Sequence, residues 1–109
     1  MINYEQFKAI EAKVGKIVEG EIVEGADKLY RFQVDFGEEK PRQILSAVRE
    51  YYPDINFFIG KKLVFVTNLE PRVIRGFESQ GMVLAVDGHD GQPVFLVPEE
   101  DAPLGSSVR

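Results

Sequence analysis

The chain has 109 residues, of which 44% are hydrophobic and 28% charged, and its formal net charge at pH 7 is -5. We expect a single domain over residues 1–109, because this length is enough for one hydrophobic core and too short for two. The absence of cysteine excludes disulfides, thiolate catalysis and cysteine-based zinc sites. No apolar run approaches the roughly 20 residues that cross a bilayer. We therefore expect a soluble, cytoplasmic protein with no membrane association.

A short N-terminal helix is predicted over residues 4–10, because Asn3 and Gln6 have the spacing of a capping box and apolar residues follow at helical intervals. A long strand is predicted from Val14 to Val23, where β-branched residues are frequent and proline is absent. Two glycines within this strand indicate bends or a bulge.

The clearest pattern in the chain is the alternation of apolar and polar residues from Tyr30 to Phe36, which predicts a strand with one buried face. A short strand is predicted over Arg42–Ala47. Pro53 and Gly60 bracket a turn or short helix, and another strand is predicted over Lys62–Thr67.

Residues 68–82 contain a proline, two glycines and two arginines, Arg72 and Arg75, and are predicted to form an ordered but irregular loop. The apolar pair between the arginines is expected to anchor this loop to the core. Loops on a rigid scaffold commonly carry binding groups, and guanidinium groups suit anions such as phosphate. The alternative is a solvated loop with surface arginines, and these residues alone give the two interpretations similar weight.

Two further strands, Met82–Val86 and Val94–Val97, are predicted to form a hairpin through a turn rich in Asp-Gly. Residues 98–109 form a C-terminal extension in which Val108 ends a final short strand. Short strands with brief helices predict an all-β fold, and a five-stranded Greek-key barrel fits the length best.

No catalytic site is predicted, because the chain has no nucleophile motif and its one histidine lies in a turn. Gly60-Lys61 lacks the upstream glycine and the following Ser or Thr of a phosphate-binding P-loop. The acids around His89 lack the spacing of a calcium loop, so a hairpin turn explains them better than a metal site. We therefore expect no enzyme activity, no cofactor and no metal.

Nucleic-acid binding has more support, although the net charge opposes it. Residues 28–75 hold nine basic and six acidic side chains, whereas residues 76–109 hold one basic and six acidic ones. If the middle strands pair, their cations converge with neutral hydrogen-bonding groups that can read bases. The cations are Lys28, Arg31, Arg42, Arg72 and Arg75, and the neutral groups are Gln33, Ser46, Asn68 and Ser79. A solvated surface of mixed charge remains the alternative.

Segments spread along the chain together resemble one family. They are residues 14–18, 26–30, 34–37 and 42–46, then Asn-Leu-Glu-Pro-Arg at 68–72 and Ser-Gln-Gly-Met at 79–82. In this order they resemble the tRNA-binding domain found free-standing or at the C-terminus of methionyl-tRNA synthetases. The resemblance implies an OB-fold barrel that binds the outer corner of tRNA with little sequence preference, assists a synthetase in cis or in trans, and forms a homodimer through its C-terminal extension.

The resemblance also implies which residues contact tRNA: Lys28, Arg42, Ser46, Asn68, Arg72, Ser79 and Met82. Arg31 and Arg75 are added from their charge and position. The chain departs from the common family pattern at Ala47, where glycine is frequent, and at Glu70, where lysine is frequent. Both departures are expected to weaken tRNA binding, Glu70 by placing a negative charge beside phosphate.

A related branch of this fold resembles an export chaperone that binds extended peptides in an apolar groove. Four aromatic residues distinguish the two functions: Tyr51, Tyr52, Phe57 and Phe58. An exposed aromatic patch favours peptide binding, whereas burial at a barrel end favours tRNA.

Overall fold

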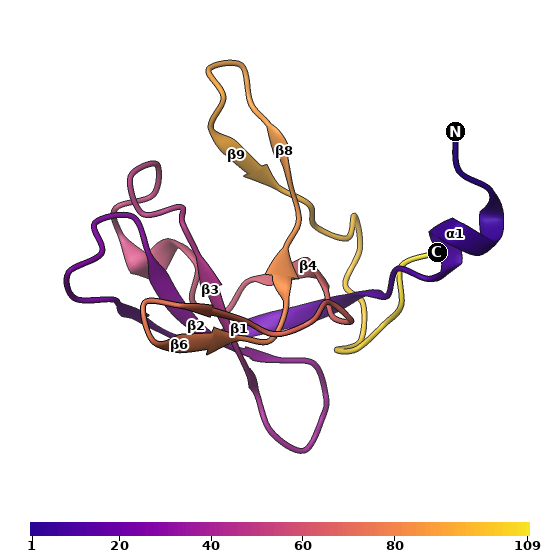
Figure 1. Cartoon of the computed structure of the whole chain (residues 1–109), viewed down its shortest axis with the longest axis horizontal. Helices are drawn as coiled ribbons and strands as arrows, with labels where there is room; N and C mark the ends of the chain where they lie inside the picture. The colour runs from indigo at the N-terminus through magenta and orange to yellow at the C-terminus, as the bar shows by residue number, and fades with distance from the viewer.

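Five antiparallel strands form the body of the protein in a computed structural model that describes residues 1–109 (Figure 1). In sheet order β3-β2-β1-β4-β7, they curl into a nearly closed barrel. Their bounds are β1 Ala12–Ile22, β2 Tyr30–Asp35, β3 Arg42–Ser46, β4 Lys62–Val66 and β7 Met82–Val83. The predicted five-stranded OB-fold is thus confirmed.

The long strand β1 holds the barrel together because it pairs with β4 along its first half and with β2 along its second. Its register with β2 shifts between Ile17 and Glu19, so the bulge lies between the two glycines and not at either of them. Gly15 serves a different purpose. A Cβ atom there would lie 2.6 Å from atoms of both Val34 and Phe36, so glycine lets β2 approach closely.

The predicted alternation in β2 is confirmed, since Tyr30, Phe32 and Val34 are buried and Phe36 beyond the strand is buried with them. These rings pack with Phe58 and Phe65 in the main core. A second, smaller core cluster lies under the β1–β2 turn: Val23, Ala26, Leu29 and Leu45.

Helices are few and short. The helix α1 (Tyr4–Lys8) has the predicted capping box between Asn3 and Gln6, but it ends at Lys8 and not at residue 10, with Ala9 as its C-cap. A 3-10 turn, η1 (Ile55–Phe57), lies within the predicted connection before β4. None of the helices has the length and apolar character needed to cross a bilayer.

The arginine-rich segment is not the irregular loop predicted from its sequence, because β5 (Arg72–Ile74) and β6 (Phe77–Ser79) pair as a β-hairpin. Arg75 and Gly76 form its tip, and their φ angles of 53° and 84° are both in the left-handed region. Two consecutive residues with positive φ are typical of the type I′ turn, whose twist matches that of paired strands. Arg-Gly is an unusual sequence for this turn, so the local sequence favours a loop over a hairpin.

The predicted strand over 82–86 is divided at Leu84 into β7, which pairs with β4, and β8 (Ala85–Asp87). β8 pairs with β9 (Pro93–Phe95) in a second hairpin that projects from the barrel at the top of Figure 1. The C-terminal extension runs beside the start of β1, but in place of the predicted final strand it makes a single bridge between Lys13 and Ser107.

Candidate nucleic-acid interface

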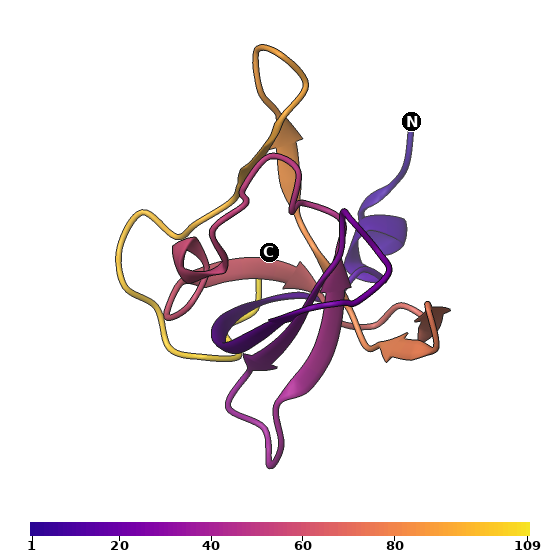
Figure 2. The same ribbon diagram turned by 90° about the vertical axis from the view of Figure 1, so that its left-hand side faces the viewer.

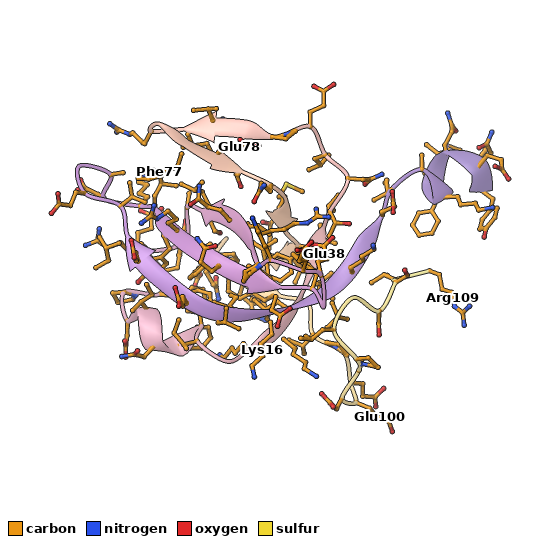
Figure 3. All side chains as sticks on the ribbon, turned by 90° about the horizontal axis from the view of Figure 1, so that it is seen from below. Lys16, Glu38, Phe77, Glu78, Glu100 and Arg109 are labelled. Carbon is orange, nitrogen blue, oxygen red and sulfur yellow. The ribbon has the colours of Figure 1, made fainter.

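The β5–β6 hairpin is fixed to the edge of β3 by hydrogen bonds. The amide of Gln80 donates to the Gln43 carbonyl at 2.7 Å, and the amide of Leu45 donates to the Ser79 hydroxyl at 3.0 Å. In Figure 2 the hairpin, drawn in brown and orange, lies at the side of the barrel, apart from the β8–β9 hairpin at the top. Figure 3 places Phe77 and Glu78 on the opposite side of the barrel from Lys16. The hairpin is therefore held against β3 by hydrogen bonds and is not a free loop.

A groove of about 500 Å³ lies between this hairpin, the end of β3 and the segment that follows β4. It is lined by Leu45, Leu69, Glu70, Arg72, Ile74, Ser79, Gly81 and Met82. Arg72 is exposed, and Met82 is 47% exposed. Glu70 places the expected negative charge in the same groove as Arg72. The structure thus brings together three predicted tRNA contacts, namely Arg72, Ser79 and Met82.

Arg72 and Arg75 are exposed, and neither has a carboxylate within 4.0 Å. Lys28, on the β1–β2 turn, lies 3.8 Å from Glu50, but both side chains are exposed and such a pair is weak. Lys28 and Arg75 line one small hollow of about 250 Å³, so the β1–β2 turn and the hairpin tip are neighbours. These three cations are free to meet an anion.

Arg31 lies beside them on β2 and is already engaged. Its guanidinium forms an ion pair with Glu21 of β1, and its central carbon lies 4.4 Å from the centre of the Phe77 ring. Arg31 and Arg75 line a further hollow of about 320 Å³ together with Phe77. Phe77 was not among the predicted site residues, since only the hairpin brings it to β2.

Arg42 lies at the base of the hairpin, beside the segments that enter and leave it. Its guanidinium makes two hydrogen bonds of 2.8 Å to Glu38 and donates to the Thr67 carbonyl at 2.6 Å. The hydrogen bonding between Arg42 and Glu38 lowers the pKa of the Glu38 carboxyl and raises the pKa of the Arg42 guanidinium. Arg42, one of the five cations expected to converge, is thus engaged within the protein, where it braces β3 against the segments on either side of the β5–β6 hairpin.

Two neutral side chains of the predicted site, Ser79 and Asn68, are also used within the protein. Ser79 is 6% exposed, and its hydroxyl accepts from the Leu45 amide and donates to the Gly81 carbonyl. Asn68 clamps the start of the chain, because its amide group donates to the Ala9 carbonyl and accepts from the Glu11 amide. Ser46 is buried opposite Tyr30. Few neutral groups of the predicted set remain to read bases.

A second groove, of about 530 Å³, is almost wholly apolar and was not foreseen from the sequence. It lies between the N-terminal segment, β4, β7 and the C-terminal extension. Its lining residues are Phe7, Ala9, Ile10, Ala12, Val66, Asn68, Leu69, Met82, Leu84 and Val108. Phe7 is 43% and Ile10 50% exposed, and α1 has no buried residue.

The barrel and its loops define the class of protein to which the chain belongs. The β1–β2 turn and the hairpin after β4 occupy the positions of the two loops that bind oligonucleotides and oligosaccharides in OB-folds. Cations on both of them indicate an oligonucleotide-binding barrel, because phosphate contacts require positive charge.

Comparison with known proteins identifies the family. Residues 12–107 match the family described as "Putative tRNA binding domain", and the chain belongs to it. Over 107 residues, or 98% of the chain, it is 42% identical to a methionine–tRNA ligase of Enterococcus faecalis, and it spans 16% of that protein.

Two solved structures resemble the whole chain. A MetRS related protein from Pyrococcus horikoshii is 31% identical with a TM-score of 0.91, and the alignment covers 100% of this chain and 98% of that one. The chaperone CsaA of Bacillus anthracis is 28% identical with a TM-score of 0.87, and the alignment covers 100% of this chain and 99% of that one.

The four aromatic residues named as the test of peptide binding divide into two pairs, because Tyr51 and Phe57 are exposed whereas Tyr52 and Phe58 are not. Phe58 is 1% exposed in the main core, and Tyr52 packs against this core and donates its hydroxyl to the Pro93 carbonyl. Phe57 stacks on Tyr52, and the ammonium group of Lys61 lies over its ring. The aromatic residues alone do not separate the two functions, and it is the family match and the similarity to a methionine–tRNA ligase that support tRNA binding better than peptide binding.

Proposed function

We propose that this chain is a non-catalytic module that holds tRNA against the face formed by the β5–β6 hairpin, the β1–β2 turn and the groove beside them. The observation that carries the proposal is that Arg72 and Arg75 are exposed without acidic partners on a hairpin fixed to the barrel. Guanidinium groups held on a rigid support bind phosphate with little loss of side-chain freedom. Family membership supports tRNA as the source of that phosphate.

Recognition is by the shape of the folded RNA rather than by its sequence. Ser79 and Asn68 use their polar groups within the protein, so these two side chains are not free to read base edges. Cations on two separate loops instead read the spacing of phosphates along a fixed RNA surface. The net charge of -5 repels RNA at long range, and binding depends on this local concentration of cations.

The test is a gel-shift titration of the protein with unfractionated tRNA at two salt concentrations. Wild type is expected to bind saturably and more weakly at the higher salt. Arg72→Ala is expected to lower affinity and to reduce the slope of log affinity against log salt by about one, the effect of one lost phosphate contact. Arg109→Ala is the matched control, since it removes the same charge from the C-terminus, away from the hairpin (Figure 3).

Two results would refute the proposal. The first is the absence of binding at low salt, and the second is an Arg72→Ala variant that behaves like Arg109→Ala. Glu70→Lys provides an independent check in the opposite direction. Because Glu70 lines the groove beside Arg72, a cation in its place is expected to tighten binding and to steepen the salt dependence.

The larger assembly is also part of the proposal. We infer that the module serves a methionyl-tRNA synthetase, in cis or in trans, in the cytoplasm, and that two copies pair through the apolar groove. The support for pairing is that Phe7, on a helix too short to be stable alone, and Ile10, just beyond that helix, are both exposed. Sedimentation equilibrium tests it: wild type is expected at dimer mass and Ile10→Glu at monomer mass, whereas a concentration-independent monomer for wild type would contradict pairing.

A further inference from the structure

The hollow at the hairpin tip differs chemically from the groove that holds Arg72. It is bordered by Ile22, Val23, Glu24, Arg31, Arg75 and Phe77, and it encloses about 320 Å³. Arg31 projects from β2, Phe77 from β6, and Arg75 from the turn between β5 and β6. Planar side chains from two distant parts of the chain, β2 and the β5–β6 hairpin, therefore border one open space.

Arg31 is held in place on two sides. Its guanidinium lies over the Phe77 ring at 4.4 Å and pairs with Glu21, its cross-strand neighbour on β1. Phe77 itself packs against the smaller core cluster under the β1–β2 turn, so the ring has firm support. The side chain of Arg31 is nevertheless 27% exposed and borders the hollow. A fixed guanidinium plane with a supported ring on one side presents its other side to a ligand.

The charges at this place do not suit phosphate. Arg31 and Arg75 are cationic, but Glu24 borders the same hollow and Glu21 already neutralises Arg31. A phosphate site needs an excess of positive charge, which the hollow lacks. A nucleobase needs something else: planar faces for stacking and a few polar groups at its edge. Arg31, backed by the Phe77 ring, supplies a planar face, Arg75 supplies donors and Glu24 supplies an acceptor.

We propose that the Arg31–Phe77 pair is a stacking platform for one unpaired base of the bound RNA, and that Arg75 and Glu24 meet the edge of this base. The inference rests on the proposed function, since it adds a base subsite to the phosphate-binding face. The backbone of Arg75 supports it: a non-glycine residue with φ of 53° is uncommon, and here it places a guanidinium at the rim of the hollow. Stacking tolerates any base and agrees with recognition by shape.

The first test uses Arg31→Lys, which keeps the positive charge and removes the plane, with Arg109→Lys as matched control. Affinity for unfractionated tRNA is measured over a range of salt. Arg31→Lys is expected to bind about fivefold more weakly or worse, the lower end of what one stacked base contributes, with an unchanged salt slope. Arg109→Lys is expected to bind like wild type. Equal affinity for Arg31→Lys and wild type, or a salt slope reduced by about one, would overturn the platform.

The second test uses the absence of tryptophan from the chain. Phe77→Trp places a single fluorophore in the platform, and Tyr4→Trp places one on α1 as control. Addition of tRNA, or of an oligoadenylate of eight nucleotides, is expected to quench the first and leave the second unchanged. Quenching of both variants, or of neither, would refute a base stacked at this position. Wild type that fails to bind tRNA would instead refute the proposed function itself, so the two failures are distinguishable.

Discussion

Arg42→Ala is predicted to destabilise the protein, although the resemblance to the family implies that Arg42 contacts tRNA. The guanidinium joins three segments: Glu38 before β3 through two bonds of 2.8 Å, the Thr67 carbonyl after β4 at 2.6 Å, and, more weakly, the Gln80 carbonyl at 3.3 Å. It also lies over the Phe36 ring. Alanine removes all of these contacts at once.

The magnitude follows from the contacts. The pair with Glu38 is partly exposed and contributes about 0.5–1 kcal/mol. A hydrogen bond from a charged donor to the partly buried Thr67 carbonyl contributes about 1.5–3 kcal/mol. The expected loss in the free energy of unfolding is therefore about 3 kcal/mol, which for a domain of this size lowers Tm by roughly 13 °C.

The assay is urea unfolding followed by far-ultraviolet circular dichroism, with Arg72→Ala as control. Arg42→Ala is expected to unfold at lower urea with an unchanged m-value, whereas Arg72→Ala is expected to stay within about 0.5 kcal/mol of wild type. Because Arg42 positions the segments beside the hairpin, its loss should weaken tRNA binding without changing the salt slope. An unchanged unfolding midpoint together with a reduced salt slope would refute the reasoning and make Arg42 a phosphate contact.

Three further substitutions test other parts of the fold. The pKa of Glu38 is lowered below its ordinary value of 4.5. Its ion pair with Arg42 therefore stabilises the protein above that pH, and this stabilisation is lost as the pH falls through the folded pKa. In urea titrations between about pH 5 and pH 3, wild type should therefore lose more stability than Glu38→Gln. Ser79→Ala leaves the buried Leu45 amide without its acceptor and should cost about 1–3 kcal/mol in the same assay, and an unchanged midpoint would mean that water replaces the hydroxyl. Gly15→Ala forces a Cβ atom to within 2.6 Å of core side chains and should cost about 1–3 kcal/mol by thermal unfolding, and wild-type Tm would show that β2 shifts freely.

Much of the barrel is determined by short stretches of sequence. The alternation from Tyr30 to Phe36 predicts both a strand and its buried face, because side chains of a strand point alternately to opposite sides. The capping box at Asn3 depends on a partner three residues away, and it is present in the structure. Such features are readable because both partners lie within a few residues of each other. The segments that resemble the tRNA-binding family are also short and local. The family match over residues 12–107 confirms that resemblance.

The placement of the site residues depends on contacts between distant segments. Arg42 meets Thr67, which is 25 residues away, and Asn68 binds the carbonyl of Ala9, 59 residues away. No local pattern distinguishes these side chains from free ones, since their polar groups are identical until the chain folds. By sequence alone, Arg42 is therefore indistinguishable from the exposed cations Arg72 and Arg75.

The β5–β6 hairpin and the stack on Phe77 were decided by tertiary structure. Arg75 is an unusual residue for a left-handed turn position, and local sequence preference predicts a loop there. Bonds from β6 and Gln80 to the edge of β3 favour the hairpin, because they pair backbone groups that the barrel would otherwise leave open. The same docking brings Phe77 to Arg31, which is 46 residues earlier in the sequence. The residue types therefore indicated an RNA-binding barrel, and the long-range hydrogen bonds decided which of its cations are engaged within the protein and which are not.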